Sequence, residues 1–132
     1  MPGTRSVKAR RRYIVFQVVG SKGLEFEEVA GSILSELLRI FGELGVSVME
    51  LKIIEYDKDS GFGVLRCSHR TVSAVQAGVS LISSISGAPV LVDVRRVTGS
   101  LKKARKIVEE LKMSKLAQAA GKDSKDSVGV PG

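Results

Sequence analysis

The chain has 132 residues, of which 43% are hydrophobic and 27% are charged, and its formal net charge is +7 at pH 7. This length and apolar content suffice for one domain with an ordinary core, which excludes a chain that is disordered throughout. No run approaches the about 20 apolar residues of a membrane-spanning helix, so we expect a cytoplasmic protein without a membrane partner. One cysteine and one histidine, Cys67 and His69, exclude an internal disulfide and the common Cys/His zinc sites.

The N-terminal segment, residues 1–11, combines basic residues with Pro, Gly and Ser and has no apolar periodicity. This composition is typical of a flexible basic arm. Residues 13–19 are β-branched and aromatic and end at a Gly-containing turn, residues 20–23, which predicts a strand. We therefore place the start of a single α/β domain at residue 12.

The next segment, residues 26–44, has apolar residues at three- and four-residue spacing, which predicts a long amphipathic helix. Three glutamates, Glu25, Glu27 and Glu28, lie in its first turn, where carboxylates favour the helix dipole. We expect Gly45 to end this helix in the left-handed conformation that glycine adopts readily.

The middle of the chain predicts a hairpin, with strands at 48–56 and 62–68 joined by a turn at 57–61. A second helix is predicted over 71–84, and the Ser-Gly-Ala-Pro sequence at 86–89 breaks it. Alternating valines then predict a fourth strand over 90–98.

A third helix is predicted after Ser100, which is a suitable N-cap residue. Its apolar side carries Leu101, Ala104, Val108 and Leu111, and its other side is basic. The chain becomes polar beyond these residues, so we predict that the domain ends at residue 116 and that 117–132 form a disordered tail.

The predicted element order is β-α-β-β-α-β with one extra C-terminal helix. This order is typical of a ferredoxin-like α/β (α+β) sandwich, similar to the RNA-recognition motif, in which two helices cover one face of a four-stranded antiparallel sheet. The other face would carry apolar side chains, which must be covered by the third helix or by a partner.

Charge is strongly segregated along the chain. Residues 24–60 contain nine carboxylates and three bases, a charge of −6, and the remainder of the chain carries +13. Basic residues near the first strand and around the third helix indicate a polyanionic partner, because phosphates bind both basic side chains and helix N-termini. An anionic membrane surface is the rival, but the third helix has no large aromatic anchor. The predicted RNA-binding residues are Arg10, Arg11, Arg12, Arg95, Arg96, Lys102, Lys103, Arg105 and Lys106.

The segment Ser60-Gly-Phe-Gly-Val-Leu-Arg-Cys67 partly follows the octapeptide of RNA-recognition motifs. Phe62 occupies one aromatic position, but Val64 and Cys67 replace the others. Phe62 and Arg66 are therefore candidate contacts on the sheet face. The competing interpretation is a hairpin turn whose glycines are needed for the backbone conformation.

No catalytic constellation emerges from the sequence. Cys67 and His69 are close in sequence, but strand alternation turns Cys67 inward and no third group is identified to orient the pair. The acidic pairs Glu27/Glu28 and Asp57/Asp59 lack the spacing of a calcium loop. We therefore predict no catalytic residue, metal site or cofactor in the polypeptide.

Several of these segments, in this order and spacing, resemble ribonuclease P protein component 2, the archaeal counterpart of a small subunit shared by eukaryotic ribonuclease P and MRP. The resemblance covers roughly residues 11–108. The segments that carry it are Arg12-Tyr-Ile-Val-Phe, Phe41-Gly-Glu-Leu-Gly45, Gly61-Phe-Gly-Val-Leu-Arg-Cys67, Ala88-Pro-Val, and Arg95-Arg-Val-Thr-Gly-Ser-Leu-Lys-Lys-Ala104.

This resemblance implies a non-catalytic subunit of an endoribonuclease that removes 5′ leaders from precursor tRNA, with the RNA and its Mg²⁺ ions performing the hydrolysis. The implied partners are ribonuclease P RNA, the TIM-barrel-like ribonuclease P protein component 3 and precursor tRNA within the complex, where the chain could also dimerise. The alternatives from the residues alone are a generic RNA-binding module, a small acyl-phosphate hydrolase on the same fold, or a homo-oligomeric ligand sensor.

Overall fold

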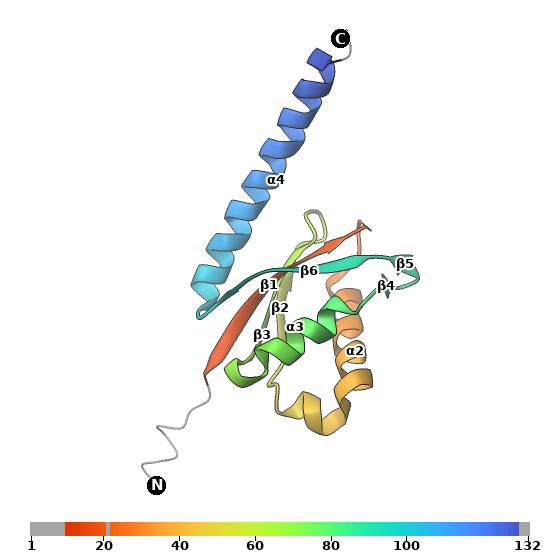
Figure 1. Ribbon diagram of the computed structural model, residues 1–132, viewed down its shortest axis with the longest axis vertical. Coiled ribbons are helices and arrows are strands. Elements are labelled where there is room, and N and C mark those ends of the chain that lie inside the picture. Colours follow the sequence, from red (N-terminus) through yellow and green to blue (C-terminus); the bar gives the residue numbers. More distant parts are fainter. Residues whose placement is uncertain (1–9, 21, 130–132) are drawn as a thin grey trace.

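The computed structural model describes residues 10–20 and 22–129, with side chains up to residue 119. Its main sheet has four antiparallel strands in the order β2-β3-β1-β6, so that β3 and β1 are central (Figure 1). This arrangement confirms the predicted ferredoxin-like fold. The strands are β1 (Arg11–Val19), β2 (Lys52–Tyr56), β3 (Phe62–Ser68) and β6 (Leu91–Thr98).

Two helices, α2 (Phe26–Ser47) and α3 (Val72–Ser80), pack on one face of this sheet (Figure 1). Side chains from the sheet and from the helices form the larger core, because period-two positions of the strands meet the apolar stripes of the helices. The fully buried members include Ile14, Phe16, Leu65, Ile33, Leu37 and Val75.

The C-terminal helix α4 (Leu101–Gly129) begins against the opposite face and extends away from the domain (Figure 1). Ala104 and Val108 of α4 pack on Val15, Phe62 and Val64, which form a second, smaller core. The predicted apolar surface on this face is therefore covered by the third helix of the chain.

The predicted end of the long helix at Gly45 is wrong. The left-handed backbone occurs earlier, at Gly42, where φ is +73° and the helix is kinked. Gly45 lies in the helical turn after this kink, and the chain leaves α2 at Val48 in a right-handed conformation. Glycine adopts a positive φ readily, and here Gly42 rather than Gly45 takes that conformation.

Other boundaries also differ from the sequence prediction. The strand predicted from residue 48 begins at Lys52, because Glu50 adopts a positive φ of 49° and interrupts the extended chain. The predicted second helix is shorter and follows a 3₁₀ turn, η1 (His69–Thr71). The segment that breaks it forms a two-residue hairpin, β4 (Ser84–Ile85) with β5 (Ala88–Pro89).

The predicted arm and tail meet the described residues only in part. Residues 1–9 lie outside them, while Arg11 is already paired with Ser68 in the sheet and the carbonyl of Arg10 accepts a 2.9 Å bond from the His69 amide. Helix α4 continues past residue 117, and its side chains from residue 120 lie outside the description. The predicted domain end at 116 stays a prediction. No helix in the described part of the chain has the length and apolar character needed to cross a membrane.

Candidate nucleic-acid interface

The start of α4 presents three lysines to solvent. The Ser100 hydroxyl oxygen accepts a 3.1 Å hydrogen bond from the Lys103 amide, which is the predicted N-cap interaction. Ala104 is fully buried against the sheet and fixes the rotation of the helix. Lys102, Lys103 and Lys106 are consequently exposed around the positive end of the helix dipole.

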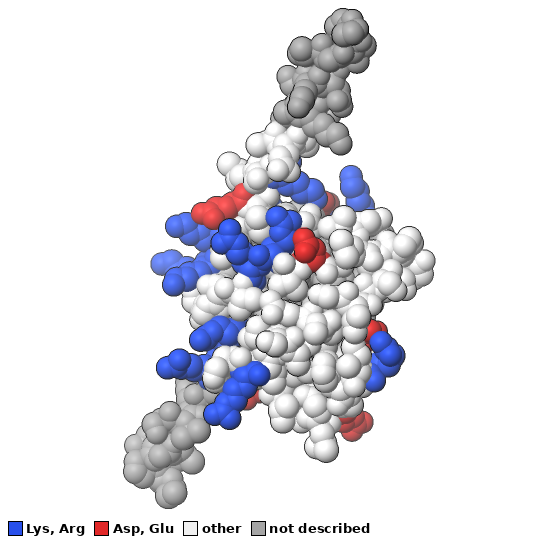
Figure 2. Space-filling view, viewed as in Figure 1, with Lys and Arg blue, Asp and Glu red and all other residues white. Residues whose placement is uncertain are grey.

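The sheet brings together the two basic segments, which are far apart in the sequence. Tyr13 near the start of β1 pairs with Thr98 at the end of β6, and Val15 pairs with Arg96. The start of β1 therefore lies beside the turn that leads into α4. Figure 2 shows Lys and Arg side chains gathered along this side of the molecule.

Three of the predicted RNA-binding residues make ion pairs within the chain. The Arg11 Nε–Glu50 Oε1 distance is 3.4 Å, the Arg95 Nε–Asp93 Oδ2 distance is 3.8 Å, and the Arg105 Nε–Glu55 Oε1 distance is 2.8 Å. All of these side chains are partly exposed, so each pair contributes little to stability.

The other six predicted residues make no ion pair with any residue in the described part of the chain. They do not form one flat patch, because Arg12 lies on the same face of β1 as Ile14, which α2 and α3 cover, whereas Arg96 pairs with Val15 on the face that α4 covers. The six are Arg10, Arg12, Arg96, Lys102, Lys103 and Lys106.

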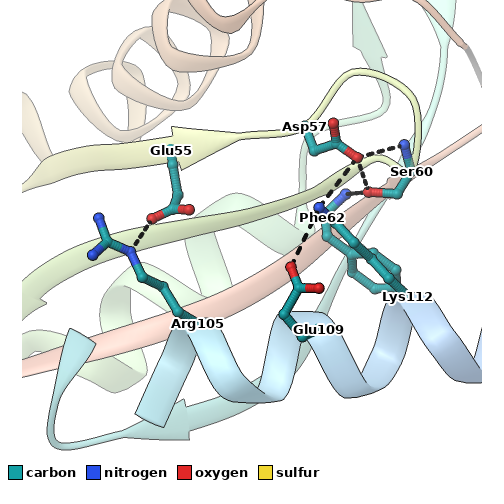
Figure 3. Close-up of polar contacts among 7 residues, drawn as sticks. All are labelled: Glu55, Asp57, Ser60, Phe62, Arg105, Glu109 and Lys112. Atoms are coloured by element: carbon teal, nitrogen blue, oxygen red, sulfur yellow. Dashed lines mark hydrogen bonds and ion pairs between the residues drawn. The ribbon is translucent and has the colours of Figure 1, made fainter. Parts of the chain in front are cut away.

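Polar contacts attach α4 to the β2–β3 hairpin along the edge of the small core (Figure 3). Besides the Arg105–Glu55 pair, Lys112 Nζ lies 3.5 Å from Asp57 Oδ2 and 3.9 Å from Glu109 Oε2. Lys115 donates a 2.8 Å hydrogen bond to the Ser60 carbonyl. The sequence did not reveal the contacts between α4 and the hairpin, because the Arg105–Glu55 bond links residues 50 positions apart and the Lys115–Ser60 bond links residues 55 positions apart.

Asp57 organises the turn that receives these lysines. Its Oδ2 accepts a 2.6 Å bond from the Ser60 hydroxyl and a 3.1 Å bond from the Ser60 amide. The Ser60 hydroxyl bond and, to a smaller extent, the nearby Lys112 charge hold the pKa of the Asp57 carboxyl below its ordinary value. Asp57 therefore remains an anion at neutral pH and keeps the α4 contact intact.

The two predicted sheet-face residues have different surroundings. Phe62 is only 2% exposed because α4 covers it, and Lys115 Nζ lies 5.9 Å from its ring centroid. In this structure its ring is unavailable for stacking on a base. Arg66 lies four residues further along β3, on the same face, and is half-buried. Its Nε is buried without a hydrogen-bond partner among the described residues.

Cys67 and His69 do not form a nucleophile–base pair. The Cys67 thiol is fully buried in the larger core, and this burial raises its pKa to about 11. His69 is exposed, and its ring nitrogen Nδ1 contacts the Arg10 carbonyl at 3.3 Å. Among the described residues, no three His, Cys, Asp or Glu side chains form a group that could hold a metal ion.

Comparison with known proteins places this arrangement in a family. Residues 12–109 match the Rpp14/Pop5 family. The archaeal relatives are named ribonuclease P protein component 2. The one from Pyrococcus furiosus is 28% identical over 101 residues, covering 76% of this chain and 84% of the relative. The one from Saccharolobus solfataricus is 33% identical over 101 residues, covering 74% and 68%, respectively.

The fold is also found in a solved structure. A chain in the cryo-EM structure of yeast ribonuclease MRP superposes with a TM-score of 0.50 at 12% sequence identity, covering 85% of this chain and 95% of that chain. At this identity the similarity concerns the fold alone. The family match, by contrast, rests on the sequence and spans the sheet, both of its covering helices and the start of α4. The chain therefore belongs to the Rpp14/Pop5 family.

Proposed function

We propose that this chain is a non-catalytic protein subunit of ribonuclease P, which binds and activates the catalytic RNA that cleaves 5′ leaders from precursor tRNA. The observation that carries the proposal is the basic side of the molecule, where the start of β1 meets the start of α4 and several cations have no carboxylate partner in the described chain. Family membership adds that the archaeal relatives bear the name of this subunit.

The chemistry of the described residues suits a helper role. The Cys67 thiol is buried and protonated at neutral pH, and the His69 ring is bonded to a backbone carbonyl at the surface. In the proposed complex the RNA and its Mg²⁺ ions carry out phosphodiester hydrolysis. The chain contributes positive charge that offsets phosphate repulsion as the RNA folds.

The proposed complex has further components. Ribonuclease P protein component 3, a TIM-barrel-like protein, is the proposed protein partner, and precursor tRNA is the substrate held within the complex in the cytoplasm. Dimerisation of this chain within the complex is compatible with the proposal. Copurification of the two proteins, with and without the RNA, tests the protein contact directly.

RNA binding is tested with a triple variant, Lys102→Ala, Lys103→Ala and Lys106→Ala. The three side chains are exposed and unpaired with described residues, so we expect the domain to stay folded. The measurement is the affinity for ribonuclease P RNA from the same organism as a function of salt concentration. Loss of about three phosphate contacts should weaken binding and reduce the slope of log K against log salt by roughly two to three.

A matched control removes the same number of charges elsewhere. Lys22→Ala, Arg39→Ala and Lys58→Ala lower the net charge equally, and two of these residues are already paired with carboxylates. We expect this variant to bind almost as tightly as the parent chain. Equal losses in the two variants would mean that only net charge matters, and would contradict a defined interface.

A further inference from the structure

A row of four polar side chains crosses the sheet beside the α4 contact, and one of its members, Tyr13, also packs against the small core. Strand pairing aligns Thr98 with Tyr13, Tyr13 with Arg66, and Arg66 with Lys52, so that one residue from each strand takes part. The row lies on the sheet face that α4 covers. Tyr13 is two residues from Val15 on β1, and Arg66 is two residues from Val64 on β3, so each pair shares one face. We infer that this row binds the phosphate backbone of the RNA, an inference that rests on the proposed function.

Arg66 is the central residue of the row. Its Nε is buried and has no hydrogen-bond partner, and its guanidinium makes no ion pair with any described residue. A buried donor without an acceptor is unfavourable, and native structures rarely retain one without a purpose. The planar guanidinium offers parallel N–H groups that match the oxygens of a phosphate. A bound phosphate would supply the missing acceptor.

The charges around Arg66 also favour the binding of an anion. Lys52 stands directly opposite Arg66 on β2, so two cations are neighbours on one face. The nearby carboxylates are already engaged, since Glu50 pairs with Arg11 and Glu55 pairs with Arg105. Like charges placed directly opposite one another are destabilising, and a phosphate between them would remove this repulsion.

The hydroxyl-bearing members of the row extend it toward α4. Tyr13 and Thr98 can donate hydrogen bonds to phosphate or ribose oxygens, and Thr98 is followed by the turn that carries Ser100, the N-cap of α4. With strands about 4.8 Å apart, the row spans about 14 Å and ends beside the first-turn lysines. This continuity with Lys102 and Lys103 favours an RNA strand over a compact acidic ligand.

The test uses the full chain and ribonuclease P RNA from the same organism, with binding measured across a salt series. Arg66→Ala should weaken binding about tenfold and lower the salt slope by about one. Arg66→Lys, which keeps the charge but loses the planar fork, should weaken binding while preserving the slope. Arg39→Ala is the matched control, because Arg39 is paired with Glu36 on α2, away from the row, and should leave both quantities unchanged.

Lys52→Ala is a second variant, at the edge strand of the sheet. It tests the row independently if Arg66→Ala lowers the melting temperature. It should also weaken binding and lower the slope by about one. If the parent chain binds the RNA and all row variants bind as Arg39→Ala does, this inference is overturned and the proposed function stands. If the parent chain fails to bind, the proposed function itself fails. Weaker association with the barrel-like protein, at unchanged RNA affinity, would assign the row to a protein and overturn the inference.

Discussion

Cys67 illustrates how alternation along a strand decides the chemistry of a single residue. Its neighbours Arg66 and Ser68 face the other way, and its thiol is enclosed by the larger core. Removal from water raises its pKa to about 11, although a hydrogen bond with Thr71 acts in the opposite direction. The inward orientation was predictable from the sequence because it follows from period-two geometry alone.

We predict that Cys67 resists thiol reagents in the folded protein. Thiolate is the reactive form, and here it is both inaccessible and disfavoured at neutral pH. Reaction with Ellman's reagent at about pH 8 should be very slow for the native protein. It should be rapid in about 6 M guanidinium chloride, a concentration that unfolds even very stable domains. Fast labelling of the native protein would contradict the buried position.

The same thiol gives a pH dependence of stability with a definite sign. In the unfolded chain it ionises near its ordinary pKa of about 8.5, whereas in the folded chain it ionises near about 11. Because the folded pKa is raised, this contribution to stability is complete below the unfolded pKa and is lost as pH rises toward the folded value. The free energy of unfolding in urea should be measured for the parent chain and for Cys67→Ala. Between about pH 8.5 and about pH 10.5, which lies between the two pKa values, it should fall less for the variant.

Gly61 has a conformational role at the end of the β2–β3 turn. Its φ is +82°, and an added Cβ would lie 2.5 Å from the Val18 carbonyl oxygen, which is a backbone atom that cannot easily move. We expect Gly61→Ala to lower the free energy of unfolding by about 2 kcal/mol or more. Gly31→Ala is the control, because nothing lies within 4 Å of its added Cβ and its φ is not positive. It should be neutral or mildly stabilising in the same denaturation experiment.

Some residue-level features could not be predicted because they depend on distant partners. Arg105 was predicted as a phosphate contact from its place in a basic cluster, but it is paired with Glu55. Phe62 was predicted as a sheet-face contact from a local motif, and α4 covers it. Local sequence gives the face on which a side chain lies, but it does not say what covers that face.

At the scale of elements, the main question is what the apolar side of α4 packs against. Its apolar stripe predicted a buried side, and the structure places that side on the sheet. The sequence alone left open whether this helix or a partner protein would cover the sheet, since both would bury the same side chains. Its small apolar contact, supported by exposed ion pairs, makes α4 the less firmly held of the layers.

We predict that Ala104→Asp detaches α4 from the sheet. A carboxylate at this fully buried position has no partner, so the helix would have to move away to hydrate it. Hydrogen exchange should become much faster in α4 while the central strands β1 and β3 stay protected, because the larger core lies on the other face.

Ala119→Asp makes the same chemical change at an exposed position of the same helix, and so it serves as the control. Its exchange at the start of α4 should match that of the parent chain. Similar exchange in the two variants would contradict the anchoring role of Ala104. If the Ala104→Asp variant lost hydrogen-exchange protection in the strands as well as in α4, the helix and the sheet would unfold as one unit.

At the scale of the whole molecule, the element order was predictable because each helix and strand has a clear apolar period. The register was not, because shifts between β1 and β6 and between β2 and β3 depend on contacts between strands. These registers decide the candidate site. They bring the start of β1 beside the start of α4, and they align the row that contains Arg66.

The charge asymmetry seen in the sequence becomes a spatial one in the fold. The acidic segment forms α2, β2 and the turn between β2 and β3, while the basic residues gather where β1, β6 and α4 meet (Figure 2). Such a distribution orients the protein as it approaches a polyanion.

The most direct test of the central claim is cleavage of precursor tRNA by the cognate ribonuclease P RNA at limiting Mg²⁺. The reaction is run with this chain, with ribonuclease P protein component 3, with both, and with neither. We predict strong stimulation when both proteins are present and no cleavage by the proteins without the RNA. Absence of stimulation by folded proteins that associate, or cleavage by this chain alone, would contradict the account.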